Sequence, residues 1–437
     1  MYYSPWMANN CIMDTQEYKT ARKKDYWYLF EMSGTILDWR PGFYIINLAY
    51  VVVMVINAVY TCACLIASIF KVDDLIDVCQ YLNFVGLLFV SLSVLASLNF
   101  QRERTLETCA IGSTEFFDYG VSFSRSEEIE QYRKEGRRRM KILFMVIPPW
   151  LTIIALSLMM SGPIDAAFSY PKINATYVNG IYQMAPLKMY YLHPIDNEFI
   201  RWLTVLSQAA CSGNTALVIG CADLIMFNAG QNVIIQLEIL NLAVLDTDKR
   251  ASKLYELKFG REPPSDPVDK TNDRPLMDIY GFCLKQIVEH HKIILRRAEV
   301  YHKIVNWPCG IVVVNGSIVV AMSLLSIMQG GGKPSVLVLS FLLIIAEVAS
   351  IFMVCEIGQS ITSQCERLFD SMYAFKWMDC SVEVNRAINI MKCRFRKPII
   401  MTAGSLTPIN RDTFGTMMNT AYSYINLVAA SGKEDAD

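Results

Sequence analysis

The stretch Phe43–Phe70, FYIINLAYVVVMVINAVYTCACLIASIF, contains no charged residue. An α-helix needs about 20 apolar residues to cross the hydrocarbon core of a bilayer, so this stretch is long enough to span one. It is too long for the apolar region of a signal peptide, and we expect it to anchor the chain in a membrane. The whole chain is 53% hydrophobic and only 19% charged, whereas soluble domains carry about 25% charged residues. This composition disfavours a soluble multidomain enzyme.

Other stretches are also long, apolar and free of charge, except for Glu347 in the last of them. They are Val78–Phe100, Ile142–Ile164, Trp202–Ala222, Ile304–Met328 and Pro334–Cys355. A seventh stretch, Thr413–Gly432, is charge-free but less apolar. Apolar runs of this length are typical of membrane-spanning helices, although a run can also form a buried helix of a soluble protein. The sequence therefore predicts an all-α membrane protein with seven transmembrane helices.

The basic residues predict the orientation. Alternate segments, beginning with the N-terminus, hold 34 Lys and Arg residues, and the segments between them hold 6. Cytoplasmic segments are enriched in Lys and Arg, so the N-terminus is predicted inside and the C-terminus outside, the reverse of a G-protein-coupled receptor. Two features agree. Asn174 begins an Asn-Ala-Thr glycosylation acceptor in a segment predicted to be extracellular. None of the 13 cysteines lies in such a segment, so no disulfide framework is expected.

The apolar runs divide the chain into six regions. These are a cytoplasmic N-terminus (1–42), four spans with the outer ligand region (43–228), a cytoplasmic helical insertion (229–306), two spans (307–357), a cytoplasmic helix (358–408), and the last span with a short outer tail (409–437).

The cytoplasmic regions carry helical periodicity. It runs over Gln231–Phe259 and resumes from Met277, and the prolines between Gly260 and Pro275 predict a non-helical break. Cys365, Leu368, Met372 and Phe375 lie on one face of the predicted third helix. Three amphipathic helices below the membrane favour a docking layer between subunits over packing within one subunit.

The longest predicted extracellular segment, 165–199, is rich in aromatic residues and prolines. It is either a lid over a ligand entrance or an ordinary packed loop with interfacial aromatic residues.

Enzymatic chemistry has no support in the sequence. There is no Gly-x-Ser-x-Gly elbow, no phosphate loop and no metal-ligand spacing, so neither catalysis nor a cofactor or metal is expected. His290 and His291 do not match His-Glu-x-x-His and are expected to face solvent. The net charge of −1 gives no indication of a nucleic-acid partner.

Two acidic residues lie within predicted spans. Glu347 is near the middle of the sixth span, and Asp223 is toward the cytoplasmic end of the fourth. Charge is costly in the bilayer, so we expect Glu347 to face the bundle interior or a cavity. It is either a polar anchor in a ligand or gating pathway or a partner in an interhelical hydrogen bond. Water or a basic side chain is expected to relieve Asp223.

The seventh span carries a stripe of neutral polar side chains at helical spacing. Its members are Thr416, Asn419, Thr420, Ser423 and Asn426. Such a stripe is typical of a water-lined pore wall, to which several subunits would each contribute one helix. The alternative is a helix that packs its polar face within its own bundle.

The last part of the chain resembles insect odorant receptors. Lys397-Pro398, Thr402-Ala403-Gly404, Phe414 and the run TAYSYINL at 420–427 follow the order of the C-terminal signature of that family. The seven helices, the inside N-terminus and the large cytoplasmic insertions also fit. The resemblance covers the whole chain in architecture and about the last 80 residues in sequence.

The resemblance implies a ligand-gated, non-selective cation channel in the dendritic plasma membrane of an olfactory neuron. Members assemble as tetramers of a variable tuning subunit with a shared odorant co-receptor, and the last helix lines the pore. It places the gate at Leu427, with Tyr424 one turn below and with Ser423 and Asn426 on the pore wall. Ala430 stands where the co-receptor has Gln, which favours a tuning subunit.

The family binds its ligand in the outer half of the bundle. On this chain the outer ends of the helices offer candidate contacts, which are Phe84, Leu87, Leu88, Leu156, Met159, Met160, Trp202, Leu206, Met322, Ser326 and Phe341. This mostly apolar set, with flexible methionines, suits a small hydrophobic odorant or pheromone, and Ser326 is a candidate hydrogen-bond donor. For any one residue, helix packing or contact with membrane lipid is the alternative.

Three other functions compete with this one. A gustatory receptor channel of the same superfamily is the nearest. A G-protein-coupled receptor is disfavoured by the charge distribution and by the absence of Asp-Arg-Tyr after the third span. A secondary transporter should show inverted repeats, which the sequence lacks.

Overall fold

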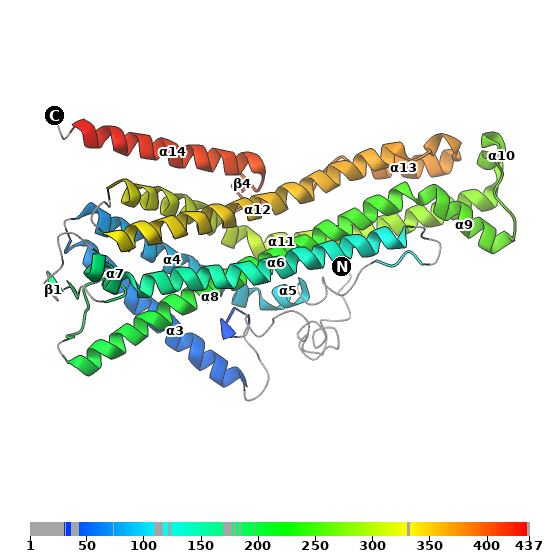
Figure 1. Ribbon diagram of the computed structural model, residues 1–437. Coiled ribbons are helices and arrows are strands. Elements are labelled where there is room, and N and C mark those ends of the chain that lie inside the picture. Colours follow the sequence, from blue (N-terminus) through cyan, green and yellow to red (C-terminus); the bar gives the residue numbers. More distant parts are fainter. Residues whose placement is uncertain are drawn as a thin grey trace.

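A computed structural model shows that the chain is almost entirely helical (Figure 1). The residues that it describes are 30, 32–35, 43–72, 74–108, 117–120, 123, 125–168, 177–178, 181–182, 185–195, 197–329 and 333–434. Every structural statement below refers to these residues.

Six of the described helices are long and apolar enough to cross a membrane. They are α3 (Phe43–Ile69), α4 (Leu75–Phe100), α6 (Ser126–Met159), α8 (Glu198–Leu245), α11 (Arg274–Gln329) and α12 (Pro334–Ala374). Each contains one of the first six predicted apolar runs or most of it. The last predicted span forms α14 (Arg411–Glu434), whose 24 residues give a helix about 36 Å long. The all-helical fold is therefore confirmed.

Several helices continue far beyond the thickness of a bilayer. The 48 residues of α8 and the 56 residues of α11 correspond to about 72 and 84 Å, against about 30 Å for the hydrocarbon core. Both run with α6 and α12 from one end of the molecule to the other (Figure 1). The helical periodicity predicted from Gln231 and from Met277 thus belongs to the same helices as the fourth and fifth spans.

The two ends of the molecule differ. One carries the short helix α7 (Ser161–Phe168), the hairpin of β1 (Tyr177–Val178) and β2 (Ile181–Tyr182), and the link between α11 and α12 (Figure 1). We call it the β1–β2 end. The opposite end, the α13 end, holds α9 (Thr247–Phe259), α10 (Pro267–Asn272) and α13 (Val382–Phe395). Another short helix, α5 (Arg102–Leu106), follows α4.

The proline-rich segment is partly helical, contrary to prediction. Asp266 accepts a hydrogen bond from the backbone N–H of Val268 and caps α10, with Pro267 in its first turn. α11 begins at Arg274, so Pro275 also lies in a first turn. Proline is tolerated at these positions because their N–H groups have no partner within the helix.

The region 358–408 is not one helix, which corrects another prediction. α12 continues to Ala374, and a single 3₁₀ turn, η4 (Trp377–Asp379), leads into α13. A hairpin of β3 (Thr402–Ala403) and β4 (Thr407–Pro408) then precedes α14. The four residues predicted to share a face of this helix are nevertheless all buried.

His290 and His291 are buried rather than solvent-facing, because the hydrophobic core continues from the membrane helices into the α13 end. The imidazole Nδ1 of His290 lies 2.7 Å from the Tyr119 hydroxyl and its Nε2 lies 2.7 Å from Oε1 of Gln236. The ring of Phe117 stacks on it at 4.7 Å between centroids. Burial, with smaller contributions from nearby cationic groups, lowers the pKa of His290 to about 3, so the ring is neutral.

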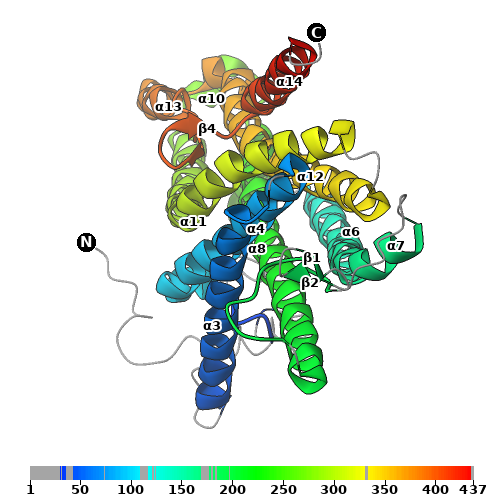
Figure 2. The same ribbon diagram turned by 90° about the vertical axis from the view of Figure 1, so that its left-hand side faces the viewer.

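Among the membrane helices, α8 is central and α6 is peripheral. Of the most apolar window of each helix, 56% is buried in α8 and 6% in α6. α14 lies along the opposite edge of the bundle from α3 and packs on α11 and α12 (Figures 1 and 2). Helices α4, α6, α8, α11 and α12 surround a cavity.

Candidate ligand-binding cavity

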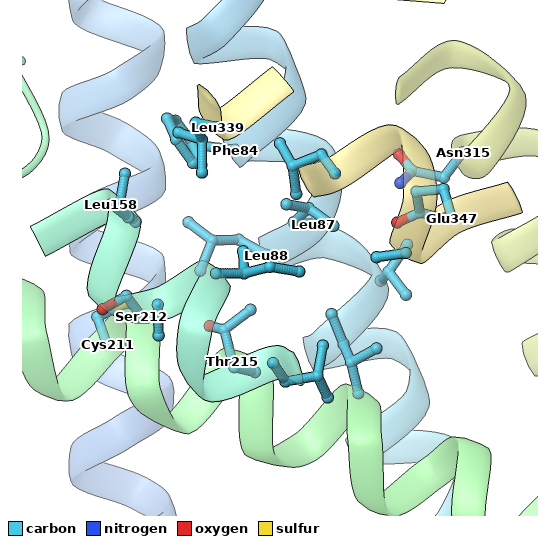
Figure 3. A pocket seen from close by; sticks show the side chains of 18 of the residues that line it. Phe84, Leu87, Leu88, Leu158, Cys211, Ser212, Thr215, Asn315, Leu339 and Glu347 are labelled. Atoms are coloured by element: carbon cyan, nitrogen blue, oxygen red, sulfur yellow. The ribbon is translucent and has the colours of Figure 1, made fainter. Parts of the chain in front are cut away.

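A cavity of about 130 Å³ lies within the membrane helices. Its wall comes from α3, α4, α6, α8, α11, α12 and the loop before α8. The apolar part of the lining includes Phe84, Leu87, Leu88, Val90, Leu151, Ile154, Ala155, Leu158, Leu187, Ala216, Ile219, Val312, Leu339, Leu343 and Ala346, and the polar part Thr61, Cys211, Ser212, Thr215, Asp223, Asn315, Glu347 and Ser350. Figure 3 shows Leu158, Cys211 and Ser212 toward one end and Asn315 and Glu347 toward the other.

Helical periodicity explains which residues line this cavity. The lining residues of α6 are Leu151, Ile154, Ala155 and Leu158. Their spacing of i, i+3, i+4 and i+7 places them on one face of the helix. α12 presents Leu339, Leu343, Ala346, Glu347 and Ser350 by the same rule. One face of each helix is therefore committed to the cavity, and its other faces pack elsewhere or are exposed.

Two carboxyl groups lie in the cavity wall. Asp223 on α8 is 8% exposed, and both of its carboxylate oxygens lie 3.3 Å from the hydroxyl of Ser350 on α12. Glu347 lies about one helical turn from Ser350 on α12 and also lines the cavity. Among the residues that the structure describes, none of those lining the cavity is basic. The described partner of Asp223 is thus a hydroxyl group and not a basic side chain, which was one of the two predicted alternatives.

Two glycines make room for the polar end of the cavity. A Cβ atom on Gly86 of α4 would lie 2.4 Å from Oδ1 of Asn315, and one on Gly316 of α11 would lie 2.9 Å from Oε2 of Glu347. The amide of Asn315 therefore rests against the backbone of α4, and the carboxyl group of Glu347 rests against the backbone of α11. Side chains at either glycine would displace these polar groups.

The loop before α8 covers the cavity toward the β1–β2 end. The side-chain amide of Gln208 on α8 bonds both backbone groups of Leu187, with Oε1 3.2 Å from its N–H and Nε2 3.1 Å from its carbonyl oxygen. The hydroxyl of Tyr81 on α4 donates to the carbonyl oxygen of Lys188 at 2.6 Å. Leu187, which lines the cavity, is thereby fixed between two membrane helices.

A small polar chamber lies on the far side of this cover. It is lined by Asp77, Gln80, Tyr81, Ser161, Pro186, Lys188, Lys333, Ser335 and Val336, and it shares Phe84, Leu158, Leu187 and Leu339 with the cavity. The four shared side chains form an apolar partition between the chamber and the cavity.

Ion pairs hold the rim of the chamber together. Lys333, in the link before α12, lies 2.8 Å from the carboxylate of Asp74 and 2.7 Å from that of Asp77 at the start of α4. The buried carboxylate of Asp165 on α7 pairs with Lys188 and accepts hydrogen bonds from the N–H and the hydroxyl of Ser335. These contacts fix the ends of α4, α7 and α12 relative to one another.

The polar stripe of α14 faces away from its own bundle. All five of its members are exposed, whereas Met417 and Ala421 on the opposite face are buried. The hydroxyls of Thr416, Thr420 and Ser423 each donate to the backbone carbonyl four residues earlier, at 2.8–2.9 Å. Packing of the polar face within the bundle of this chain, one of the two sequence-based interpretations, is therefore wrong.

α14 is fastened to α12 just beyond the cavity. The guanidinium group of Arg411 makes two hydrogen bonds to the carboxylate of Glu356, at 2.7 and 2.8 Å. The rings of Phe352 and Phe414 pack edge to face with centroids 5.4 Å apart. Phe352 follows Ser350, which lines the cavity, so one short segment of α12 contacts both the cavity and α14.

Residues 74–422 match the sequence model of the family described as 7tm Odorant receptor. The chain belongs to the odorant receptor family. The receptor is therefore a membrane protein of a family of chemoreceptors rather than an enzyme.

Relatives agree with this assignment, and solved structures share the fold. Odorant receptor 85b of Drosophila melanogaster is 24% identical over 33% of the receptor and 37% of its own length. Odorant receptor 2a of the same species is 22% identical over 43% of the receptor and 47% of its own length. The olfactory receptor OR5 of Machilis hrabei in complex with eugenol superposes with a TM-score of 0.75 at 11% identity, over 94% of the receptor and 98% of that chain. A second OR5 structure gives a TM-score of 0.70 at 14% identity, over 92% and 95% of the two chains.

The receptor brings some of the predicted site residues together. Phe84, Leu87 and Leu88 line the cavity, and so do Glu347 and Asp223. Leu156, Met159, Met160, Trp202, Leu206, Met322, Ser326 and Phe341 do not line it. The prediction used the outer end of each span, whereas the cavity lies about two turns deeper on α8 and α11 and on a different face of α6.

Other predicted sites lie outside the described residues. Asn174 is one, and the side chains of Tyr424, Leu427 and Ala430 are also outside, although the backbone there is helical. In the part of the receptor that the structure describes, no group of His, Cys, Asp or Glu side chains is arranged to hold a metal ion.

Proposed function

We propose that this receptor is the odorant-binding subunit of a ligand-gated, non-selective cation channel. The observation that carries the proposal is an apolar cavity that is enclosed by the membrane helices and connected through α12 to the helix with an exposed polar stripe. A volume of about 130 Å³ is close to the roughly 150 Å³ of an engineered protein cavity that binds benzene. The ligand is accordingly a small volatile with one ring or a short chain.

The mechanism begins with displacement of α12. A ligand in the cavity contacts Leu343 and Ala346, and an enlarged cavity moves this segment outward. Phe352 and Glu356, within the next two to three turns, hold α14 through Phe414 and Arg411. Movement of α12 therefore moves α14 outward. The polar stripe of α14 then lies farther from the pore axis. Ligand shifts the equilibrium only because the open state fits it better.

The pore needs more than one subunit. One exposed polar stripe cannot enclose water, so stripes from several subunits must face one another. The partner is an odorant co-receptor in a heterotetramer, and the gate is at Leu427 of each tuning subunit.

The eugenol complex of OR5 supports a small organic ligand. The loop that holds Leu187 acts as a lid between the polar chamber and the cavity.

The orientation follows from the basic residues, with the N-terminus in the cytoplasm and the β1–β2 end outside. The chamber then opens to the fluid around the dendrite of a sensory neuron. The docking layer at the α13 end lies in the cytoplasm.

Co-expression tests the proposal. Cells that express the receptor with an odorant co-receptor are exposed to a panel of small volatiles, and whole-cell current is recorded. We expect ligand-evoked cation currents that persist when G-protein signalling is blocked. Surface-expressed receptor without current for any ligand, or current that requires G proteins, contradicts it.

A further inference from the structure

The cavity is chemically asymmetric. Toward Leu158 it is apolar with scattered hydroxyl and thiol groups, and at the other end it has the carboxyl group of Glu347 and the amide of Asn315 (Figure 3). The carboxyl group of Asp223 lies 3.3 Å from the hydroxyl of Ser350, which is about one turn from Glu347 on α12, so Asp223 belongs to the same end. A ligand that only required an apolar container would not need the acidic end. The asymmetry indicates a ligand that is apolar over most of its surface and carries one polar group.

The acidic groups have no cationic counterpart. Lys and Arg are absent from the cavity lining, and no described residue forms an ion pair with Asp223 or Glu347. The hydroxyl of Ser350 is the hydrogen-bond partner of Asp223, and no described side chain donates to Glu347. A charged carboxylate at mid-membrane costs about 3 kcal/mol or more unless a cation or a proton neutralises it. A ligand that supplied the cation would recover this cost.

Two glycines allow the polar groups at this end of the cavity to lie close to the helix backbones. Gly316 lets the Glu347 carboxyl group lie against α11, and Gly86 lets the Asn315 amide lie against α4. Both polar groups thereby withdraw to the wall and leave the space in front of them open. Leu87 borders the same end (Figure 3), and Val312 lies about one turn from Asn315 on α11. These aliphatic side chains would contact the carbon atoms next to a ligand's polar group.

From these observations we propose that the cavity selects small amphipathic amines, whose ammonium group is bound between Glu347 and Asp223 while the hydrocarbon part fills the apolar end. An alkylamine is protonated at neutral pH, as the pKa of about 10.4 for lysine illustrates. It donates up to three hydrogen bonds, which Glu347, Asp223 and the Asn315 carbonyl oxygen can accept. The inference rests on the proposed function for the location of the ligand, and it adds the chemical class.

Binding to the purified full-length receptor in nanodiscs tests this class without requiring a channel. The probes are benzylamine, benzyl alcohol and toluene, which share one ring and differ in the polar group. Thermal stabilisation as a function of concentration gives each dissociation constant. We expect benzylamine to bind about tenfold or more tightly than benzyl alcohol.

Variants attribute the preference to the two carboxyl groups. Glu347→Gln and Asp223→Asn keep the shape of each side chain and should each weaken benzylamine binding about tenfold while leaving toluene unchanged. Glu366→Gln, an exposed position farther along α12, is the matched control and should change neither. Equal affinity for the three probes, or an amine preference that survives both cavity variants, overturns the inference. Amine binding without current in co-expressing cells leaves the inference standing and contradicts the channel function instead.

Discussion

The ring of Phe352 on α12 packs edge to face against the ring of Phe414 on α14, with 5.4 Å between the centroids. This contact lies two residues beyond Ser350, whose side chain lines the ligand cavity. The cavity and the polar helix are therefore joined by about half a turn of α12, and the short connection makes the coupling testable by substitution.

Removing this aromatic contact should uncouple binding from opening. Aromatic pairs contribute about 1 kcal/mol beyond the area that they bury, equivalent to about a fivefold change in an equilibrium constant. We expect Phe352→Ala to lower the maximal ligand-evoked current several-fold while the affinity of the purified receptor for ligand is unchanged. Phe341→Ala, at an exposed position of the same helix outside the cavity, is the control. A variant with full current would show that the ring pair does not transmit the movement.

The ion pair between Arg411 and Glu356 should contribute modestly, since both side chains are at least one-third exposed. Exposed pairs contribute about 0–1 kcal/mol. We expect Arg411→Glu to shift the half-maximal ligand concentration up to about fivefold, and the exchange Glu356→Arg with Arg411→Glu to restore part of it. Concentration–response curves for the two single variants and the double variant measure the coupling. Strict additivity of the two single effects would mean that the pair does not act as a unit.

Cavity size should set the size of the ligand. Leu343→Ala removes side-chain atoms from the wall and should favour larger volatiles, while it destabilises the receptor by about 2–5 kcal/mol if the space stays empty. A homologous series of ligands, tested by current amplitude, should show its optimum moved by one to three carbon atoms. Leu206→Ala, an exposed position outside the cavity, should leave the optimum unchanged. An unmoved optimum in Leu343→Ala would place the ligand elsewhere.

Gly86 should not tolerate a side chain. A Cβ atom there would lie 2.4 Å from Oδ1 of Asn315, so the amide must move. We expect Gly86→Ala to destabilise the receptor by about 1–3 kcal/mol, as overpacked sites do. Gly213→Ala on α8, where no atom lies within 4 Å of the new Cβ, is the control and should be neutral or stabilise the receptor slightly. Melting temperatures in detergent compare the two, and equal values would contradict the tight packing of Asn315 on α4.

His290 should make stability depend on pH. Its pKa is lowered to about 3 in the folded state by burial, whereas an unfolded histidine titrates near 6.5. Between these values the unfolded chain binds the extra proton, so stability is complete above about pH 6.5 and is lost as the pH falls toward 3. His291, whose pKa is lowered to about 4, acts in the same direction.

Replacing His290 isolates its contribution. His290→Gln should flatten the decline of the unfolding free energy between pH 7 and pH 5 by at most about 1.4 kcal/mol per pH unit, which denaturation at a series of pH values measures. His302→Gln, at a less buried position of the same helix, should flatten it less. A decline that is identical in the wild type and in His290→Gln would mean that His290 is not neutral in the folded receptor.

The order of helices could be predicted from the sequence, but the faces of the helices could not. Charge-free runs mark spans because charge is costly in lipid, and α3 begins at Phe43 as its run does. A membrane helix lacks the polar face that marks the exposed side of a soluble helix, since lipid-facing and core-facing positions are both apolar. Leu158 lines the cavity and Leu156 is exposed, although both are leucines near the same end of α6.

Polar residues within the spans predicted the candidate site better than the apolar residues did. The stripe of α14 was visible because Thr416 and Asn419 stand out in an apolar run, and Glu347 and Asp223 were singled out for the same reason. Their meeting in one cavity required the packing of α8 against α12, which no periodicity encodes. The burial of His290 depended in the same way on Tyr119, which is 171 residues away.

Ligand-evoked current in excised outside-out patches tests directly whether a ligand in the cavity opens an ion channel. The patches come from cells that co-express the receptor with an odorant co-receptor, and the pipette contains no GTP. A small volatile should open a current reversing near 0 mV. Leu88→Trp, which fills the cavity, should abolish this current, and Leu206→Trp on the exposed face of α8 should not. A current that fails without GTP, or one that Leu88→Trp leaves unchanged, would contradict the account.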